Sequence, residues 1–144
     1  MLRQVLVGGV VSLGNIAIHA IVMATVVDTA RNALKWNRRQ SKTWLAAVMV
    51  ATVAILMVAH VVEVITWALA YVILDVVAAG ADALYFAFVN YTTLGYGDVL
   101  PAERWRLLGP MAAMNGVLLF GWSTAVIFEV LRQAMRNRDW RGNP

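Results

Sequence analysis

The segment Thr92–Asp98 reads TTLGYGD and holds the residue types in this chain that are best suited to binding an ion. Glycines stand at alternate positions, Gly95 and Gly97, and glycine adopts left-handed backbone angles at little cost. Such angles allow successive backbone carbonyls of an extended segment to point the same way. A dehydrated monovalent cation needs rings of these oxygens in place of its hydration shell. The segment therefore predicts main-chain ligands at Thr93, Leu94, Gly95 and Tyr96.

The composition indicates that this segment lies in a membrane protein. The chain has 144 residues, of which 61% are hydrophobic and 14% charged, and its mean hydropathy is +0.69. Soluble domains usually carry about 25% charged residues. The chain has no cysteine, which excludes disulfides and thiol chemistry, and its two histidines cannot by themselves form a metal site. We expect no enzyme activity, no cofactor other than a permeant ion, and no nucleic-acid partner.

Three apolar stretches are long enough to cross a bilayer, which takes about 20 residues. They run over about 5–27, 44–74 and 107–131. The first lacks the features of a cleaved signal peptide, so we expect it to be retained. The second is unusually long but has no Gly, Pro or polar cluster for a turn, which favours one long tilted helix. The fold class predicted is an all-α membrane protein.

The distribution of basic residues predicts the orientation. Basic residues gather in the connection 28–42 and in the tail 132–144, and the positive-inside rule places both in the cytoplasm. The N-terminus is then outside, in the plasma (cell inner) membrane. The basic residues of the connection either anchor the protein on anionic lipid or form a regulatory lipid site. They are Arg31, Lys35, Arg38, Arg39 and Lys42.

Residues 81–91 form an apolar, aromatic run between the second and third spans. The run is too short to cross a bilayer and too apolar for an exposed loop, so it predicts a re-entrant helix buried in protein. It leads directly into Thr92–Asp98 on the external side, and Pro101 and the third span follow.

Together these features resemble the pore of the potassium-channel family over residues 44–132. The resemblance rests on the short aromatic helix, TTLGYGD, Asp98-x-x-Pro101, Trp105, Gly116 and Phe120-Gly121. It implies an N-terminal helix and basic connection (1–42), a pore domain (43–131) and a short basic tail (132–144). It also implies passive, potassium-selective conduction, with K⁺ at Thr93, Leu94, Gly95 and Tyr96 and a filter completed by Gly97. One chain supplies one strand of a four-strand ring, so a homotetramer is implied.

The residues expected to support the filter depart from the family pattern. Tyr85 and Phe86 stand where many members carry tryptophan, and Phe86 cannot hydrogen-bond to Tyr96. A brace for Tyr96 must then come from Asn90, from a neighbouring chain or from packing. Tyr85 is a plausible partner for Asp98. We expect selectivity to survive and filter rigidity to differ.

Three further residues invite a functional or a structural interpretation. Gly116, in the middle of the third span, is either a gating hinge or the site of a close helix crossing. His60 and Glu63 lie one turn apart, and ionisable groups within a span are costly. We expect a hydrogen-bonded pair that faces the first span or the short helix. It is either a pH-sensitive gating pair or a structural contact.

The first span carries a stripe of small and polar residues that predicts packing against protein. We expect this helix to support the second span, with Gly8 and Ser12 near the depth of His60 and His19 near Thr52. The tail 132–144 is expected to be a frayed helical extension or disordered. The stripe consists of Gln4, Gly8, Ser12, Asn15 and His19.

Two other functions remain open. The chain is alternatively a non-conducting subunit that modulates other pore proteins, or a weakly selective monovalent cation channel. An intact TTLGYGD argues against the first, and Tyr96 argues against the second.

Overall fold

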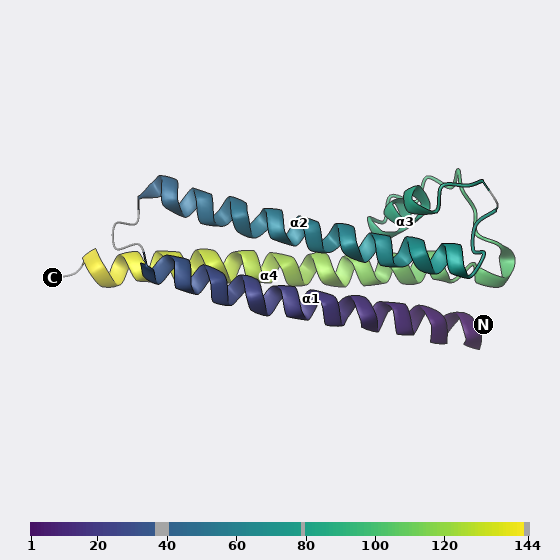
Figure 1. Cartoon of the computed structure of the whole chain (residues 1–144), viewed down its shortest axis with the longest axis horizontal. Coiled ribbons are helices and arrows are strands. Elements are labelled where there is room, and N and C mark those ends of the chain that lie inside the picture. The colour runs from purple at the N-terminus through teal and green to yellow at the C-terminus, as the bar shows by residue number, and fades with distance from the viewer. Residues whose placement is uncertain (37–40, 79, 143–144) are drawn as a thin grey trace.

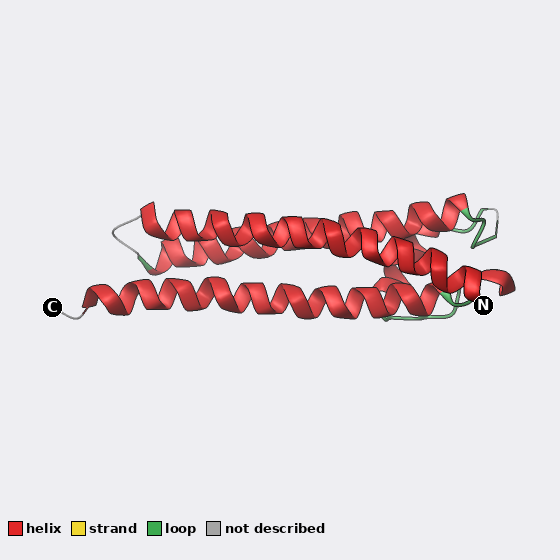
Figure 2. Ribbon diagram, turned by 90° about the horizontal axis from the view of Figure 1, so that it is seen from below, coloured by secondary structure: helices red, strands yellow, loops and turns green. Residues whose placement is uncertain are grey.

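The computed structural model describes residues 1–36, 41–78 and 80–142. In these residues the secondary structure is helical: α1 (Leu2–Trp36), α2 (Lys42–Ile73), α3 (Ala83–Tyr91), the 3-10 turn η1 (Glu103–Trp105) and α4 (Leu108–Gly142). The long helices α1, α2 and α4 run side by side, and α3 lies at one end of the bundle (Figures 1 and 2). Three helical stretches are long and apolar enough to span a membrane, which confirms an all-α membrane protein: Leu2–Leu34, Lys42–Ile73 and Glu103–Arg136.

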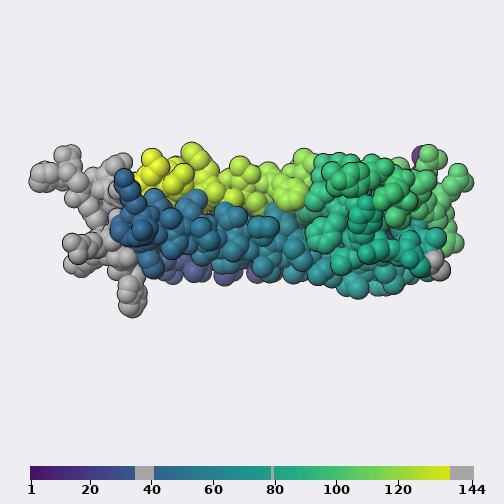
Figure 3. All heavy atoms as spheres, turned by 90° about the horizontal axis from the view of Figure 1, so that it is seen from above, coloured from purple at the N-terminus to yellow at the C-terminus, as the bar shows by residue number. Residues whose placement is uncertain are grey.

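The two ends of the chain lie at opposite ends of the bundle. The N-terminus lies at the same end of the bundle as α3, and the last turns of α4 lie at the other end with the end of α1 and the start of α2 (Figure 1). The space-filling view shows the α3 end as the broader part of an elongated molecule (Figure 3). The element order matches the predicted three long helices with one short helix between the second and the third.

Capping residues determine where α2 and α3 begin. The hydroxyl of Ser41 accepts a hydrogen bond from the Trp44 amide at 3.1 Å, and the Asp82 carboxylate accepts one from the Tyr85 amide at 2.9 Å. Ser and Asp satisfy the unpaired amides of a first helical turn in this way. The second span is one unbroken helix, as its sequence predicts, and the run 81–91 forms the short helix α3.

Apolar side chains form two cores at opposite ends of the bundle. At the α3 end, aromatic residues of α2, α3 and η1 pack together, among them Trp67, Tyr71, Phe86 and Trp105. Towards the other end, aliphatic residues of α1, α2 and α4 pack together, among them Val26, Leu56 and Val130. The aromatic core holds α3 against α2 and the start of α4.

The helix α1 packs against α4 as well as against α2. The Gln4 side chain accepts a hydrogen bond from the Leu107 amide at 2.9 Å, and the Arg3 guanidinium lies 5.0 Å from the Trp105 ring centre. A side chain on Gly8 would meet Met111 of α4. Gln4, Asn15 and His19 are buried, which confirms that the polar stripe packs against protein.

The predicted depth of α1 is wrong by several turns. His19 contacts Glu63 rather than lying near Thr52, and Gly8 lies beside α4 rather than at the depth of His60. The prediction ended the first helix near residue 27, where the charges begin. No Gly or Pro occurs over 28–36, so α1 continues to Trp36 and the whole helix is displaced relative to α2.

The basic residues predicted to contact lipid fall partly on helices. Arg31 and Lys35 belong to α1, and Lys42 begins α2. Arg38 and Arg39 lie outside the described residues. The tail takes the helical alternative, because α4 continues through residues 132–142.

Gly116 allows α4 to pass close to the end of α3. A Cβ atom added to Gly116 would collide with the backbone carbonyl of Tyr91. α4 is an unbroken helix through this point. The close crossing therefore accounts for the glycine, and a hinge role remains a prediction.

We expect Gly116→Ala to destabilise the protein although alanine is the better helix former. The atom it would strike is backbone and cannot swing aside, so the free energy of unfolding should fall by about 1–3 kcal/mol. Thermal unfolding of the purified protein in detergent measures this change. Gly14→Ala on α1 is the control, because its added Cβ meets nothing within 4 Å. Equal stability of the two variants would contradict the close crossing.

Candidate functional site

The segment after α3 has left-handed backbone angles at alternate positions. The φ angle is +62° at Thr93, +58° at Gly95 and +76° at Gly97. Leu94 and Tyr96 do not have positive φ. Alternate left-handed angles are the backbone condition for successive carbonyls to point the same way. The structure has such angles at three positions, whereas the sequence predicted them at the two glycines.

The sequence predicted Thr93 as a main-chain ligand but did not predict its positive φ. A positive φ is rare for a β-branched residue and costs roughly 1–2 kcal/mol. Backbone hydrogen bonds hold this part of the chain against the end of α3: Thr93 N–H donates to the Asn90 carbonyl at 2.9 Å, and Leu94 N–H donates to the Val89 carbonyl at 2.9 Å. The first turn after α3 therefore fixes the unfavourable angle in place.

Tyr85 and Asp98 join the outer end of the segment to α3. The Tyr85 hydroxyl donates to Asp98 Oδ2 at 2.6 Å, and the Val99 amide donates to Asp98 Oδ1 at 3.1 Å. The structure thus brings together the pair that the sequence suggested. The hydrogen bond to Asp98 raises the pKa of Tyr85, because ionisation would break the bond and place a second negative charge beside the carboxylate.

The structure does not bring Asn90 and Tyr96 together within one chain. The Asn90 amide donates to the Phe86 carbonyl, one turn back on its own helix, at 2.7 Å. Its side-chain oxygen packs against Gly109, because a Cβ atom added to that glycine would lie only 2.6 Å from Asn90 Oδ1. Tyr96 is 67% exposed and Leu94 is 55% exposed. The structure therefore shows no brace for Tyr96 from Asn90 within the chain.

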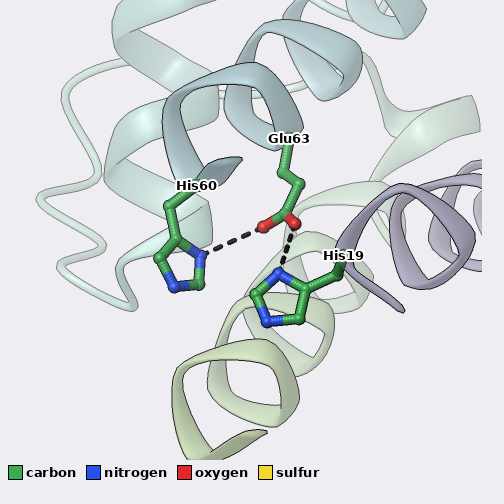
Figure 4. Close-up of side chains that lie close together, drawn as sticks. All are labelled: His19, His60 and Glu63. Carbon is green, nitrogen blue, oxygen red and sulfur yellow. Dashed lines mark hydrogen bonds and ion pairs between the residues drawn. The ribbon is translucent and has the colours of Figure 1, made fainter. Parts of the chain in front are cut away.

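A second group of polar residues is buried among the helices. Its centre is the carboxylate of Glu63, which lies between two imidazole rings (Figure 4). His19 Nδ1 is 2.6 Å from Glu63 Oε1, and His60 Nδ1 is 3.0 Å from Glu63 Oε2. The Tyr91 hydroxyl donates to Glu63 Oε2. The predicted contact between His60 and Glu63 is present and faces both α1 and α3; its role in gating stays a prediction.

The far sides of both rings meet α4. His60 Nε2 lies 2.9 Å from Ser123 Oγ, and His19 Nε2 lies 3.3 Å from the same oxygen. Sequence reasoning missed Ser123 because a serine in an apolar span carries no distinct signal. It missed His19 because it misjudged the depth of α1. We call His19, His60, Glu63, Tyr91 and Ser123 the buried cluster.

An amide group extends the polar contacts beyond the buried cluster. Asn15 Nδ2 donates to the Glu63 carbonyl at 3.2 Å and to Asn115 Oδ1 at 3.1 Å. Trp67 Nε1 donates to Asn115 Oδ1 at 3.1 Å. Together the contacts of the buried cluster and these amides link α1, α2, α3 and α4 within the apolar part of the bundle.

The two histidines and the glutamate are residue types that bind zinc, and their ligand atoms lie within 4.8 Å of one another. Each of these atoms already has a hydrogen-bonding partner in the buried cluster. The carboxylate occupies the space between the rings that an ion would have to enter. The geometry fits a hydrogen-bonded network better than a metal site.

Comparison with known proteins places this pore-like arrangement in a family. A family described as ion channels, of a two-transmembrane type, matches residues 59–133, just over half of the chain. This chain belongs to the ion channel family. No curated protein and no solved structure matches it.

The family match covers the segment described above and most of the buried cluster of the channel. It includes the second half of α2, all of α3, Thr92–Asp98 and α4 as far as residue 133. His60, Glu63, Tyr91 and Ser123 lie inside it, and His19 lies outside on α1. The family assignment indicates transport of ions across a membrane rather than enzyme activity.

We expect Asp98→Asn to lower the pKa of Tyr85 towards the ordinary tyrosine value of about 10. The hydrogen bond needs the protonated phenol, so it is present below the ordinary pKa and is lost as the pH rises through the raised value. Absorbance of tyrosinate during a pH titration measures the change, and Tyr85→Phe identifies which signal belongs to Tyr85. Glu103→Gln, at an exposed acid in η1, is the control for loss of a negative charge. A Tyr85 titration unchanged by Asp98→Asn would contradict the contact.

Proposed function

We propose that the channel is potassium-selective and conducts K⁺ passively through a filter made by the backbone of residues 93–97. The observation that carries this proposal is the set of left-handed angles at Thr93, Gly95 and Gly97, directly after a short helix in a member of the ion channel family. Carbonyl oxygens of Thr93, Leu94, Gly95 and Tyr96 replace the hydration shell of the ion, and the Thr93 hydroxyl closes the inner end.

The proposed conducting unit is a homotetramer. One chain has one such segment, and a carbonyl ring of this kind is built from four. Side chains that a neighbour would cover are exposed in the single chain, among them Leu94 and Tyr96. Burial of the Tyr96 ring against another subunit would supply the brace that Asn90 does not provide.

The proposed orientation puts the N-terminus and the α3 end outside the cell and the C-terminus in the cytoplasm of a plasma (cell inner) membrane. The charges support it, because the basic residues concentrate at the opposite end from α3. Anionic lipid headgroups would contact Arg31 and Lys42 there, together with Lys35, Arg38 and Arg39.

Ion flux from liposomes that contain the purified protein tests the proposal. We expect efflux down a K⁺ gradient that barium blocks, and little flux down an equal Na⁺ gradient. Equal flux of both ions would favour a weakly selective cation channel. No flux together with no stable tetramer would favour a modulatory subunit.

A matched pair of glycine variants tests whether residues 93–97 are the filter. Gly95→Ala puts a side chain at φ +58°, and Gly80→Ala puts one at φ +89° in the loop before α3; neither added Cβ meets an atom within 4 Å. Each change therefore adds a similar backbone strain of roughly 1–2 kcal/mol without a clash. That strain lowers the population of the native local conformation roughly 5–30-fold.

We expect Gly95→Ala to lose most K⁺ flux or its preference over Na⁺, because the strain acts on the carbonyls that bind the ion. Gly80→Ala should conduct with unchanged preference. The helix content of both variants, from circular dichroism, shows whether each has folded. Unaltered K⁺ conduction by a folded Gly95→Ala protein would place the selective site elsewhere.

A further inference from the structure

The buried cluster contains both histidines of the chain. Its titratable groups come from three helices: His19 from α1, His60 and Glu63 from α2, and Tyr91 from α3. From α4, Ser123 contacts the rings and has no ionisable group. The number of hydrogens that this network needs can be counted from its contacts.

The Nδ1 atoms of both rings face the carboxylate. The distances are 2.6 Å from His19 and 3.0 Å from His60, and a carboxylate can only accept hydrogen bonds. The Tyr91 hydroxyl donates its hydrogen to Glu63, and its oxygen also lies 3.0 Å from His60 Nδ1, where it can only accept. Both Nδ1 atoms therefore carry a hydrogen, and the carboxylate has a donor at each oxygen.

The Nε2 atoms of both rings face one hydroxyl. Ser123 Oγ lies 2.9 Å from His60 Nε2 and 3.3 Å from His19 Nε2. A serine hydroxyl has a single hydrogen to donate, so it can satisfy the lone pair of only one ring. The other Nε2 must carry its own hydrogen and donate to Ser123. That ring then has hydrogens on both nitrogens and is positively charged.

The distances favour His19 as the ring that carries the charge. Its contact with Glu63, 2.6 Å, is shorter than the 3.0 Å contact of His60, and charge-assisted hydrogen bonds are the shorter kind. Ser123 then donates to His60 Nε2, its nearer neighbour, and accepts from His19 Nε2. One imidazolium and one carboxylate give a net charge of zero, which suits a site with low exposure inside a membrane span.

We propose that His19, His60 and Glu63 form a binding site for one shared proton, which Ser123 completes. With the proton bound, hydrogen bonds of the buried cluster connect α1, α2 and α4 beside Tyr91, the last residue of α3. Raising the pH removes the proton. The cluster then has a net negative charge, and a lone pair of His19 faces a lone pair of Ser123. The contact of α4 with α1 and α2 is weakened in that state.

Nitrogen NMR of the full chain in lipid tests the proton count. With ¹⁵N-histidine labelling and a purification tag free of histidine, every ring signal belongs to His19 or His60. At pH 7.5 a free imidazole is roughly nine-tenths neutral. We expect one ring with both nitrogens protonated and one neutral ring with its hydrogen on Nδ1, and a second bare Nε2 as the pH rises. Two neutral rings at pH 7.5, or two charged rings, would overturn the proposal.

Variants separate the shared proton from general packing. Glu63→Gln removes the negative charge that balances the imidazolium, so both rings should be neutral at pH 7.5. Ser123→Ala should shift the Nε2 signals of both rings. Thr124→Ala is its control, because it removes a neighbouring hydroxyl that bonds only within α4. Ring signals that respond equally to Ser123→Ala and Thr124→Ala would overturn the bridge.

Thermal stability supplies a second measurement of the same site. A proton held by the folded protein and released on unfolding stabilises the fold, and this stability is lost as the pH rises through the titration of the cluster. The Tm of the wild type should therefore fall by a few degrees over the pH range in which the NMR signals change. The Tm of Glu63→Gln should not follow this change; if that variant does not fold, Ser123→Ala replaces it. A wild-type Tm that is constant over this range would overturn the proposal.

Discussion

The buried carboxylate of Glu63 is the constraint on which much of this bundle depends. A charged group within a membrane span is tolerated only when it is paired and hydrogen-bonded. Glu63 is fully buried, and its partners come from three helices: His19 of α1, His60 of its own helix and Tyr91 of α3. Removal of α1 or α3 would take one of these partners away from the buried carboxylate. The need to satisfy one side chain therefore fixes how α1, α2 and α3 lie against each other.

Tyr91 transmits this constraint to the segment proposed as the filter. Its hydroxyl donates to Glu63, while its backbone carbonyl lies against Gly116 of α4. The residue is fully buried and is followed directly by Thr92 and Thr93. The start of the segment is thus held by the buried cluster and by a close helix crossing. Its outer end is held by the contact between Tyr85 and Asp98. Residues 93–97 between them are exposed in the single chain.

The sequence predicted those features that depend on local pattern. Hydropathy located the three long helices, the run 81–91 located α3, and a one-turn spacing located the contact between His60 and Glu63. Features that depend on tertiary contacts were not predictable in the same way. The depth of α1 depends on how far the helix continues past its apolar part, and charge marks the membrane boundary rather than the helix end. A positive φ at Thr93 opposes the preference of threonine and arises from bonds to Asn90 and Val89. The Asn90 amide donates to the Phe86 carbonyl on its own helix rather than to Tyr96.

The position of His19 changes how α1 is to be understood. The ion channel family matches residues 59–133, which include Glu63, His60, Tyr91 and Ser123, and within the described residues the hydrogen bond to Glu63 Oε1 comes from His19. His19 lies outside the matched region. Its Nδ1 is 2.6 Å from the Glu63 carboxylate, closer than the 3.0 Å of His60 Nδ1. A helix that only increased the contact with lipid would not need a fully buried histidine facing inwards. α1 therefore completes the hydrogen bonding of the buried carboxylate, and the matched part without α1 would have a buried carboxylate that lacks one of its donors.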